Sequence, residues 1–236
     1  FLKKGIFYKI RENTFNLFFR IIFLFPNLKV ILQNRSDLNY LVNKAKLKKK
    51  KTEIIRGSGV DLKSLKFSKI PKKEPTIVMA SRIIADKGIF EYIKSIQYLK
   101  KNNFKGKFYL VGDIDYKNPS AIKESTINYW HKKKIITYVK HQKKISTFLK
   151  KSTIVVLPSY REGFPKILME AAACGRPVVT TNVPGCKDAI IKNITGVLVP
   201  PKNHILLAKA IKNLCDNRKK LELIGKAARK HALKNF

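Results

Sequence analysis

The feature that most constrains the fold is a regular alternation of short apolar runs and amphipathic segments from residue 76 to the C-terminus. The runs have strand length and many β-branched residues, whereas the segments between them repeat apolar residues at helical spacing. The expected strands are residues 76–80, 107–111, 134–139, 153–158, 178–181 and 197–199, and the expected helices are 88–101, 120–131, 145–150, 165–174, 204–215 and 218–232. Strands that alternate with helices form βαβ units, so the sequence predicts an α/β fold with a Rossmann-like parallel sheet.

The turn at residues 159–165, Ser-Tyr-Arg-Glu-Gly-Phe-Pro, joins the fourth of these strands to the next helix. Pro165 suits the first turn of a helix, where no N–H is needed, and Gly175 marks a typical helix end. We expect the turn to leave the backbone N–H groups of Gly163 and Phe164 at the positive end of a helix. Such an arrangement binds anions, above all phosphate.

Two carboxylates bracket this turn. Glu162 precedes the helix, and Glu170 lies eight residues further on, where a side chain that leans toward the N-terminus points at the same cleft. The pair suits a ligand with hydroxyls on both sides of a diphosphate, as in a nucleotide sugar. The alternative is that both are solvated helix charges, which is the common case for glutamate. The small run Ala-Ala-Ala-Cys-Gly after Glu170 indicates tight packing and favours the site.

Two cations, Arg82 and Lys87, follow the first expected strand of this region and precede Gly88. They can neutralise a diphosphate that departs with both of its charges. In a chain this basic they can equally be solvated side chains. Their place between a strand and a glycine favours the functional interpretation.

The Glu162-Gly163-Phe164-Pro165 run with Glu170 resembles the E-x7-E signature of retaining glycosyltransferases of the GT-B fold, in particular family four, including its polysaccharide and lipid-linked glycan enzymes. Further pieces follow that pattern in the same order: Arg56-Gly57-Ser58-Gly59-Val60-Asp61, Ser81-Arg82 with Lys87-Gly88, residues 177–181, Val183-Pro184-Gly185 and residues 196–201. The resemblance extends from about residue 54 to the C-terminus, and six motifs in register are specific.

The resemblance implies a fragment that contains the C-terminal, donor-binding half of such an enzyme. It implies hexosyl transfer with retention from a nucleotide diphosphate sugar, with a UDP-sugar as first choice, to a polysaccharide or polyprenyl-linked acceptor in cell-envelope glycan synthesis. Glu162, Arg82 and Lys87 would be catalytic, and Glu170, Gly163, Phe164, Pro165, Tyr138 and Val139 would bind the donor. Glu162 would hold sugar hydroxyls and Glu170 the ribose. The base pocket of the family lies near Tyr138 and Val139. Beside it, Lys140 and Lys144 depart from the family pattern, so the identity of the nucleotide base stays open.

We expect no metal ion and no cofactor besides this co-substrate. Asp113-Ile114-Asp115 has the form of the D-x-D metal motif of another glycosyltransferase architecture, but residues 110–113, Leu-Val-Gly-Asp, resemble the strand-end glycine turn of a GT-B donor domain. The three cysteines, at 174, 186 and 215, have neither metal-ligand nor disulfide spacing. Three widely spaced cysteines without a disulfide pattern favour a reducing, cytoplasmic compartment.

The formal net charge of +36, from 51 basic and 15 acidic residues, normally suggests a polyanionic partner. Lysines are spread along the chain and no nucleic-acid motif is present, so we expect no nucleic-acid partner. A peripheral position at the inner face of the cell membrane, against anionic lipid, is the more plausible use of the charge. A merely compositional excess of lysine is the alternative.

Residues 1–62 are expected to be the remnant of an N-terminal acceptor domain, 63–75 a linker and 76–236 the nucleotide-sugar domain. The chain starts without Met and in mid-pattern, which suggests a piece of a longer enzyme that is inactive by itself. Residues 15–25 are apolar but too short to cross a bilayer, so they either lie in a membrane interface or form a helix of the N-terminal domain that packs on the core of that domain. Two rival functions remain: a non-catalytic module that binds nucleotide sugars or anionic lipid, and a glucan synthase that uses ADP-glucose.

Overall fold

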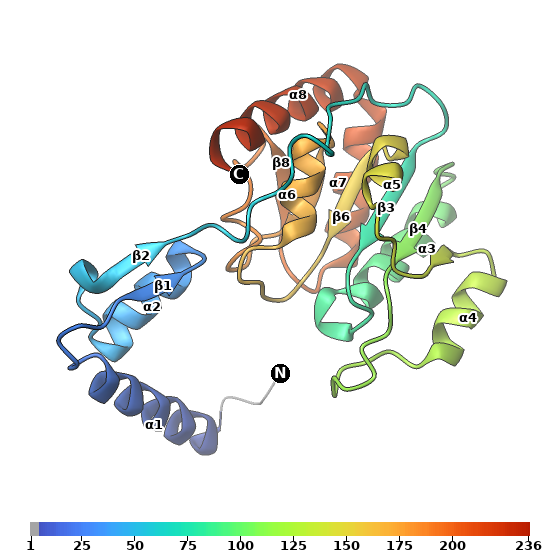
Figure 1. Cartoon of the computed structure of the whole chain (residues 1–236). Coiled ribbons are helices and arrows are strands. Elements are labelled where there is room, and N and C mark those ends of the chain that lie inside the picture. Colours follow the sequence, from blue (N-terminus) through green and yellow to red (C-terminus); the bar gives the residue numbers. More distant parts are fainter. Residues whose placement is uncertain (1–4) are drawn as a thin grey trace. The chain divides into compact units, whose positions relative to one another are not determined.

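A computed structural model describes residues 5–236, and the chain divides into two compact units, Phe1–Gly57 and Ser58–Phe236 (Figure 1). The first unit contains helix α1 (Ile6–Ile22), strand β1 (Val30–Leu32), helix α2 (Arg35–Ala45), the 3-10 turn η1 (Lys49–Lys51) and strand β2 (Thr52–Ile54). The two strands pair in parallel. Asn34 starts α2, because its side chain accepts the backbone N–H of Asp37 at 2.8 Å.

Helix α1 contains most of the apolar segment for which a membrane interface was one expectation. Phe19 and Ile22 pack on the small core around Phe23, whereas Phe15 and Phe18 are exposed. Within residues 5–236, no helix has both the length and the apolarity that crossing a bilayer requires.

The second unit, every residue of which is described, contains a six-stranded parallel sheet, as the alternating pattern predicted. Its strands are β3 (Thr76–Ala80), β4 (Lys107–Val111), β5 (Thr137–Val139), β6 (Ile154–Leu157), β7 (Val178–Thr181) and β8 (Gly196–Val199). They lie in the order β5-β4-β3-β6-β7-β8. This is the doubly wound Rossmann order, in which the chain reverses direction across the sheet between its first and fourth strands, here β3 and β6.

Helices cover both faces of this sheet (Figure 1). The helices are α3 (Ile89–Lys101), α4 (Glu124–Lys132), α5 (Ser146–Lys151), α6 (Lys166–Ala173), α7 (His204–Asp216) and α8 (Arg218–Asn235), with the 3-10 turn η2 (Ala85–Lys87) before α3. Helix α3 packs against α7 on one face and α6 against α8 on the other. The central strands β3 and β6 are buried apart from Thr76, which explains their continuous apolar runs, whereas the edge strand β5 has no buried residue.

Strand β5 is three residues shorter at its start than the expected 134–139. The reason is the end of helix α4, where Ile135 N–H bonds the carbonyl of Trp130 and Lys134 takes a left-handed φ of 53°. Helix α4 in turn starts later than residue 120, because Ala121 forms a turn with Asn118 and a bridge to Ile84. Both differences come from local hydrogen bonds that periodicity does not show.

The segment expected as a linker, residues 63–75, is held on the second unit by three arginines. Arg229 donates to the carbonyl of Leu65 at 2.8 Å, and Arg218 donates to those of Ile70 and Pro71, both at 2.6 Å. The third, Arg176, is fully buried and donates to carbonyls of residues 68, 69 and 152. Burial lowers the pKa of Arg176 to about 10. Backbone carbonyls therefore satisfy this buried cation in place of a carboxylate.

Candidate active site

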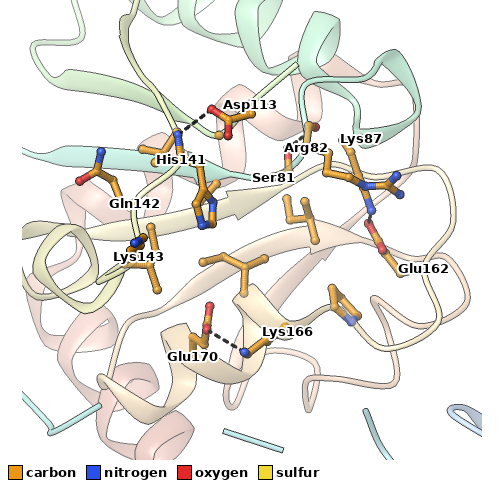
Figure 2. Close-up of a pocket in the computed structure, with 17 residues that line it drawn as sticks. Ser81, Arg82, Lys87, Asp113, His141, Gln142, Lys143, Glu162, Lys166 and Glu170 are labelled. Atoms are coloured by element: carbon orange, nitrogen blue, oxygen red, sulfur yellow. Dashed lines mark hydrogen bonds and ion pairs between the residues drawn. The ribbon is translucent and has the colours of Figure 1, made fainter. Parts of the chain in front are cut away.

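A pocket of about 570 Å³ lies at the carboxyl ends of the parallel strands, next to β3 and β6, where the strand order reverses (Figure 2). Residues that directly follow β3 and β4 line it, together with the β5–α5 loop, the turn before α6 and the first two turns of α6. In open parallel sheets ligands bind in this crevice. The lining residues include Ser81, Arg82, Lys87, Gly112, Asp113, His141, Gln142, Lys143, Glu162, Pro165, Lys166, Ile167 and Glu170.

The floor of the pocket requires a glycine at position 112. Gly112 follows β4 with φ of 145°, and a Cβ there would lie 1.9 Å from the carbonyl oxygen of Ser81. Its N–H bonds the carbonyl of Val139. The loops after β3 and β4 can therefore approach each other only because no side chain separates them.

The Val183-Pro184-Gly185 segment packs against the turn before α6 and fixes its position. Glu162 N–H bonds the carbonyl of Pro184 at 3.1 Å, and a Cβ on Gly185 would lie 2.3 Å from the carbonyl oxygen of Glu162. Pro165 is the N-cap residue, so α6 starts one residue later than expected, at Lys166. The start of this helix faces the pocket, and it brings the positive end of the helix dipole to it.

Lys87 and Glu162 form an ion pair at one end of the pocket, with 2.6 Å between Nζ and Oε1. Their side chains are 15% and 11% exposed. Backbone bonds bring the two segments together: the carbonyl of Asp86 accepts the N–H of Tyr160 at 2.9 Å and the hydroxyl of Ser159 at 3.2 Å. A cation and a carboxylate are thus presented to the pocket as one fixed unit.

Arg82 also lines the pocket, but its guanidinium pairs with Asp115 at 2.7 Å. Its side chain is 60% exposed, far more than that of Lys87. Figure 2 shows Arg82, Lys87 and Glu162 together at one end of the pocket. Both cations singled out in the sequence therefore lie in one site, each with a carboxylate partner.

Glu170 enters the pocket from the second turn of α6. Its side chain is 15% exposed, and burial raises the pKa of its carboxyl group, while Lys166 at 3.9 Å opposes that shift. Glu162 and Glu170 do border one cleft, as the lean of helical side chains predicted.

The residues expected near the base are placed differently from the rest. Tyr138 and Val139 do not line the pocket; the Tyr138 hydroxyl instead donates to the carbonyl of Gly112 at 3.0 Å. The next loop lines it, through His141, Gln142 and Lys143 (Figure 2). The His141 N–H donates to the Asp113 side chain at 3.0 Å and links this loop to the segment after β4. No partner of His141 is evident in the sequence, and only the tertiary arrangement assigns this residue to the pocket.

Gly163 and Phe164, expected to contact phosphate through their N–H groups, are likewise not among the lining residues. The Phe164 ring is 7% exposed and packs edge-on against Phe236. This side chain secures the turn to the core. The role of the two N–H groups stays a prediction.

Residues 5–236 contain no cluster of three or more His, Cys, Asp or Glu side chains arranged to hold a metal ion. The two aspartates of the D-x-D sequence have other partners, Asp113 the His141 N–H and Asp115 the Arg82 guanidinium. Cys174 and Cys186 are buried and Cys215 is partly buried.

Residues 61–231 match the model of the family described as Glycosyl transferases group 1. The chain is 29% identical, over an alignment that covers 99% of it, to the N,N'-diacetylbacillosaminyl-diphospho-undecaprenol alpha-1,3-N-acetylgalactosaminyltransferase of Campylobacter jejuni. It spans 63% of that relative's length. The chain belongs to the Glycosyl transferases group 1 family.

Two solved structures share the fold. Sucrose-phosphate synthase from Thermosynechococcus elongatus superposes with a TM-score of 0.80 at 24% identity, over 94% of this chain and 57% of that one. Anabaena Alr3699/HepE, solved in complex with UDP, gives a TM-score of 0.77 at 21% identity, over 88% of this chain and 59% of the other. At these identities the likeness establishes the GT-B type of fold that the sequence predicted.

Proposed function

We propose that the chain is the donor-binding half of a retaining glycosyltransferase that moves a hexosyl group from a nucleotide diphosphate sugar. The observation that carries this proposal is the gathering of Arg82, Lys87, Glu162 and Glu170 around one crevice at the start of α6. Two cations and a helix N-terminus suit a diphosphate, and a carboxylate on either side suits the hydroxyls of sugar and ribose.

In this proposal Lys87 and Arg82 bind the diphosphate and stabilise its charge as the glycosidic bond breaks. Glu162 accepts hydrogen bonds from the transferred sugar, and its contact with Lys87 holds it beside the reacting phosphate. Glu170 accepts hydrogen bonds from the hydroxyls of the ribose, and these bonds compensate the free-energy cost of burying its carboxylate. The backbone N–H groups of Gly163 and Phe164 complete the anion site, and Pro165 fixes the start of α6.

The base would lie over the β5–α5 loop, next to Tyr138 and Val139. A UDP-sugar is the proposed donor, supported by the UDP complex of the Anabaena relative in fold. The acceptor would be a polysaccharide or a polyprenyl-linked glycan, supported by the undecaprenol-linked substrate in the name of the Campylobacter jejuni relative. Such an acceptor places the enzyme at the cytoplasmic face of a membrane, where the net charge of +36 favours anionic lipid.

The stereochemical claim is tested with the full-length enzyme and a UDP-sugar. The anomeric configuration of the first-formed product, followed by NMR, is expected to match that of the donor. An inverted product would refute the retaining mechanism and leave donor binding intact.

The second candidate is a non-catalytic module, favoured by the formal net charge of +36. Calorimetry with UDP-sugars, in the presence and absence of anionic vesicles, distinguishes the two. Saturable nucleotide binding supports the donor domain. Binding to vesicles alone, weakened by salt, supports the lipid-binding module.

A further inference from the structure

The Asp113-Ile114-Asp115 segment holds the loop that carries Arg82. Beyond the sheet, the loops after β3 and β4 continue side by side: Ile83 N–H bonds the carbonyl of Asp113 at 2.8 Å, and Ile83 bridges Ile114 in parallel. The carbonyl of Asp115 accepts the N–H of Asn118 at 2.9 Å. Asp115 is therefore fixed opposite Arg82 by backbone contacts.

The Arg82–Asp115 pair sits where a diphosphate would need the cation. Arg82 lines the pocket, whereas Asp115 lies outside the lining. The Asp115 side chain is 26% exposed and that of Arg82 is 60% exposed. Because solvent already surrounds most of the arginine side chain, Arg82 can move away from Asp115 and keep its charge hydrated. A partly solvated ion pair of this kind is weak, which makes its exchange for another anion easy.

We propose that Asp115 competes with the diphosphate for Arg82 and so lowers the affinity of the pocket for the nucleotide. This rests on the proposed function. A bound diphosphate takes the guanidinium, and Asp115 takes it back when the nucleoside diphosphate leaves. No covalent bond changes; one anionic partner of Arg82 replaces another. Asp115 thus acts through Arg82: it weakens nucleotide binding and favours product release.

The test is calorimetric titration of Asp115→Asn with UDP, ADP and GDP and with the matching nucleosides. Because only the competing charge is removed, the variant should bind the preferred nucleoside diphosphate about two- to fivefold more tightly, the range expected for a weak exposed pair. Affinity for the nucleoside should not change, since it has no phosphate. In an Arg82→Gln background the gain should disappear. Asp115→Ser, which also lacks the charge, should reproduce the gain.

Asp216→Asn is the matched control. Asp216 is the last residue of α7 and pairs with Lys212 at 2.6 Å, outside the pocket lining, so this variant removes the same charge from an exposed pair elsewhere. It should leave nucleotide affinity unchanged.

Three outcomes would overturn the proposal: unchanged or weaker binding of the diphosphate by Asp115→Asn, a gain that persists without Arg82, or an equal gain in Asp216→Asn. Weaker binding would mean that Asp115 orients Arg82 for the ligand instead of competing with it. Failure of wild-type protein to bind any of the three nucleoside diphosphates would refute the proposed function as well.

Discussion

At one end of the pocket, Lys87 and Glu162 are held by backbone contacts from η2 and from the segment at Pro184 and Gly185. At the other end, His141, Gln142 and Lys143 lie on a loop that the His141 N–H links to Asp113, just after β4. We call the first the turn end and the second the loop end. The turn end has the groups suited to a diphosphate, and the loop end faces the proposed base. The turn end, which several backbone contacts hold, is therefore where the proposed chemistry takes place, whereas the more loosely held loop end is where the nucleotide is selected.

The largest effect is expected from Glu162→Gln at the turn end. In the full-length enzyme this variant should lower turnover by about 10²–10³-fold or more, because an amide cannot replace a charged acceptor in the transition state. Transfer assays measure it. Glu222→Gln is the control: Glu222 is partly exposed and pairs with Arg218 on α8, outside the pocket lining, so this variant should leave turnover unchanged. Near wild-type turnover of Glu162→Gln would remove Glu162 from the mechanism.

Gly185→Ala tests whether the turn end is as rigid as its contacts indicate. The new Cβ would collide with the carbonyl of Glu162, and φ is +79°, so the turn must shift. We expect a loss of about 1–3 kcal/mol in the free energy of unfolding and weaker nucleoside diphosphate binding. Chemical denaturation and calorimetry report the two. A variant that keeps both values would show that the turn tolerates movement.

The loop end should respond differently. Gln142 donates to the carbonyl of Lys140 within its own loop, and it lines the pocket. Gln142→Ala should alter the ratio of UDP, ADP and GDP affinities by less than about tenfold, the scale of one lost hydrogen bond. The midpoint of thermal unfolding should stay constant. An equal loss for all three nucleotides would contradict a role in reading the base.

The smallest effect concerns stability and pH. Burial raises the folded-state pKa of Glu170, so ionisation of this residue opposes folding. The penalty is absent below the unfolded-state pKa, near 4.3, grows as pH rises above that value, and is complete above the folded-state pKa. Glu170→Gln should therefore unfold at a higher temperature than wild type at pH 7 and match it near pH 3.5. If the unfolding temperatures of the variant and wild type differed by the same amount at both pH values, ionisation of Glu170 would not be the cause of the difference.

Much of the fold follows from the sequence because local patterns determine it. The β-branched runs gave six strands, and Gly and Pro marked the ends of α6. The boundaries of α4 and β5 could not be predicted, since they depend on hydrogen bonds of Asn118 and Trp130.

The gathering of Arg82, Lys87, Glu162 and Glu170 was also predictable, because the first three lie in segments that follow strands, Glu170 leans toward a helix start, and parallel strands end on one edge. The loop end was not. The orientation of Tyr138 toward Gly112 and the entry of residues 141–143 into the pocket depend on how two loops pack, which has no periodic signal.

The central claim is that the turn end binds a diphosphate through Lys87, and the most direct measurement compares nucleotide with nucleoside. Calorimetry on wild type should show that UDP, or whichever nucleoside diphosphate is preferred, binds at least about tenfold more tightly than its nucleoside. Lys87→Met should lose most of that difference, and so should Lys87→Met/Glu162→Gln, which leaves no unpaired carboxylate behind. Equal affinity for nucleotide and nucleoside in wild type, or an unchanged difference in both variants, would contradict the account.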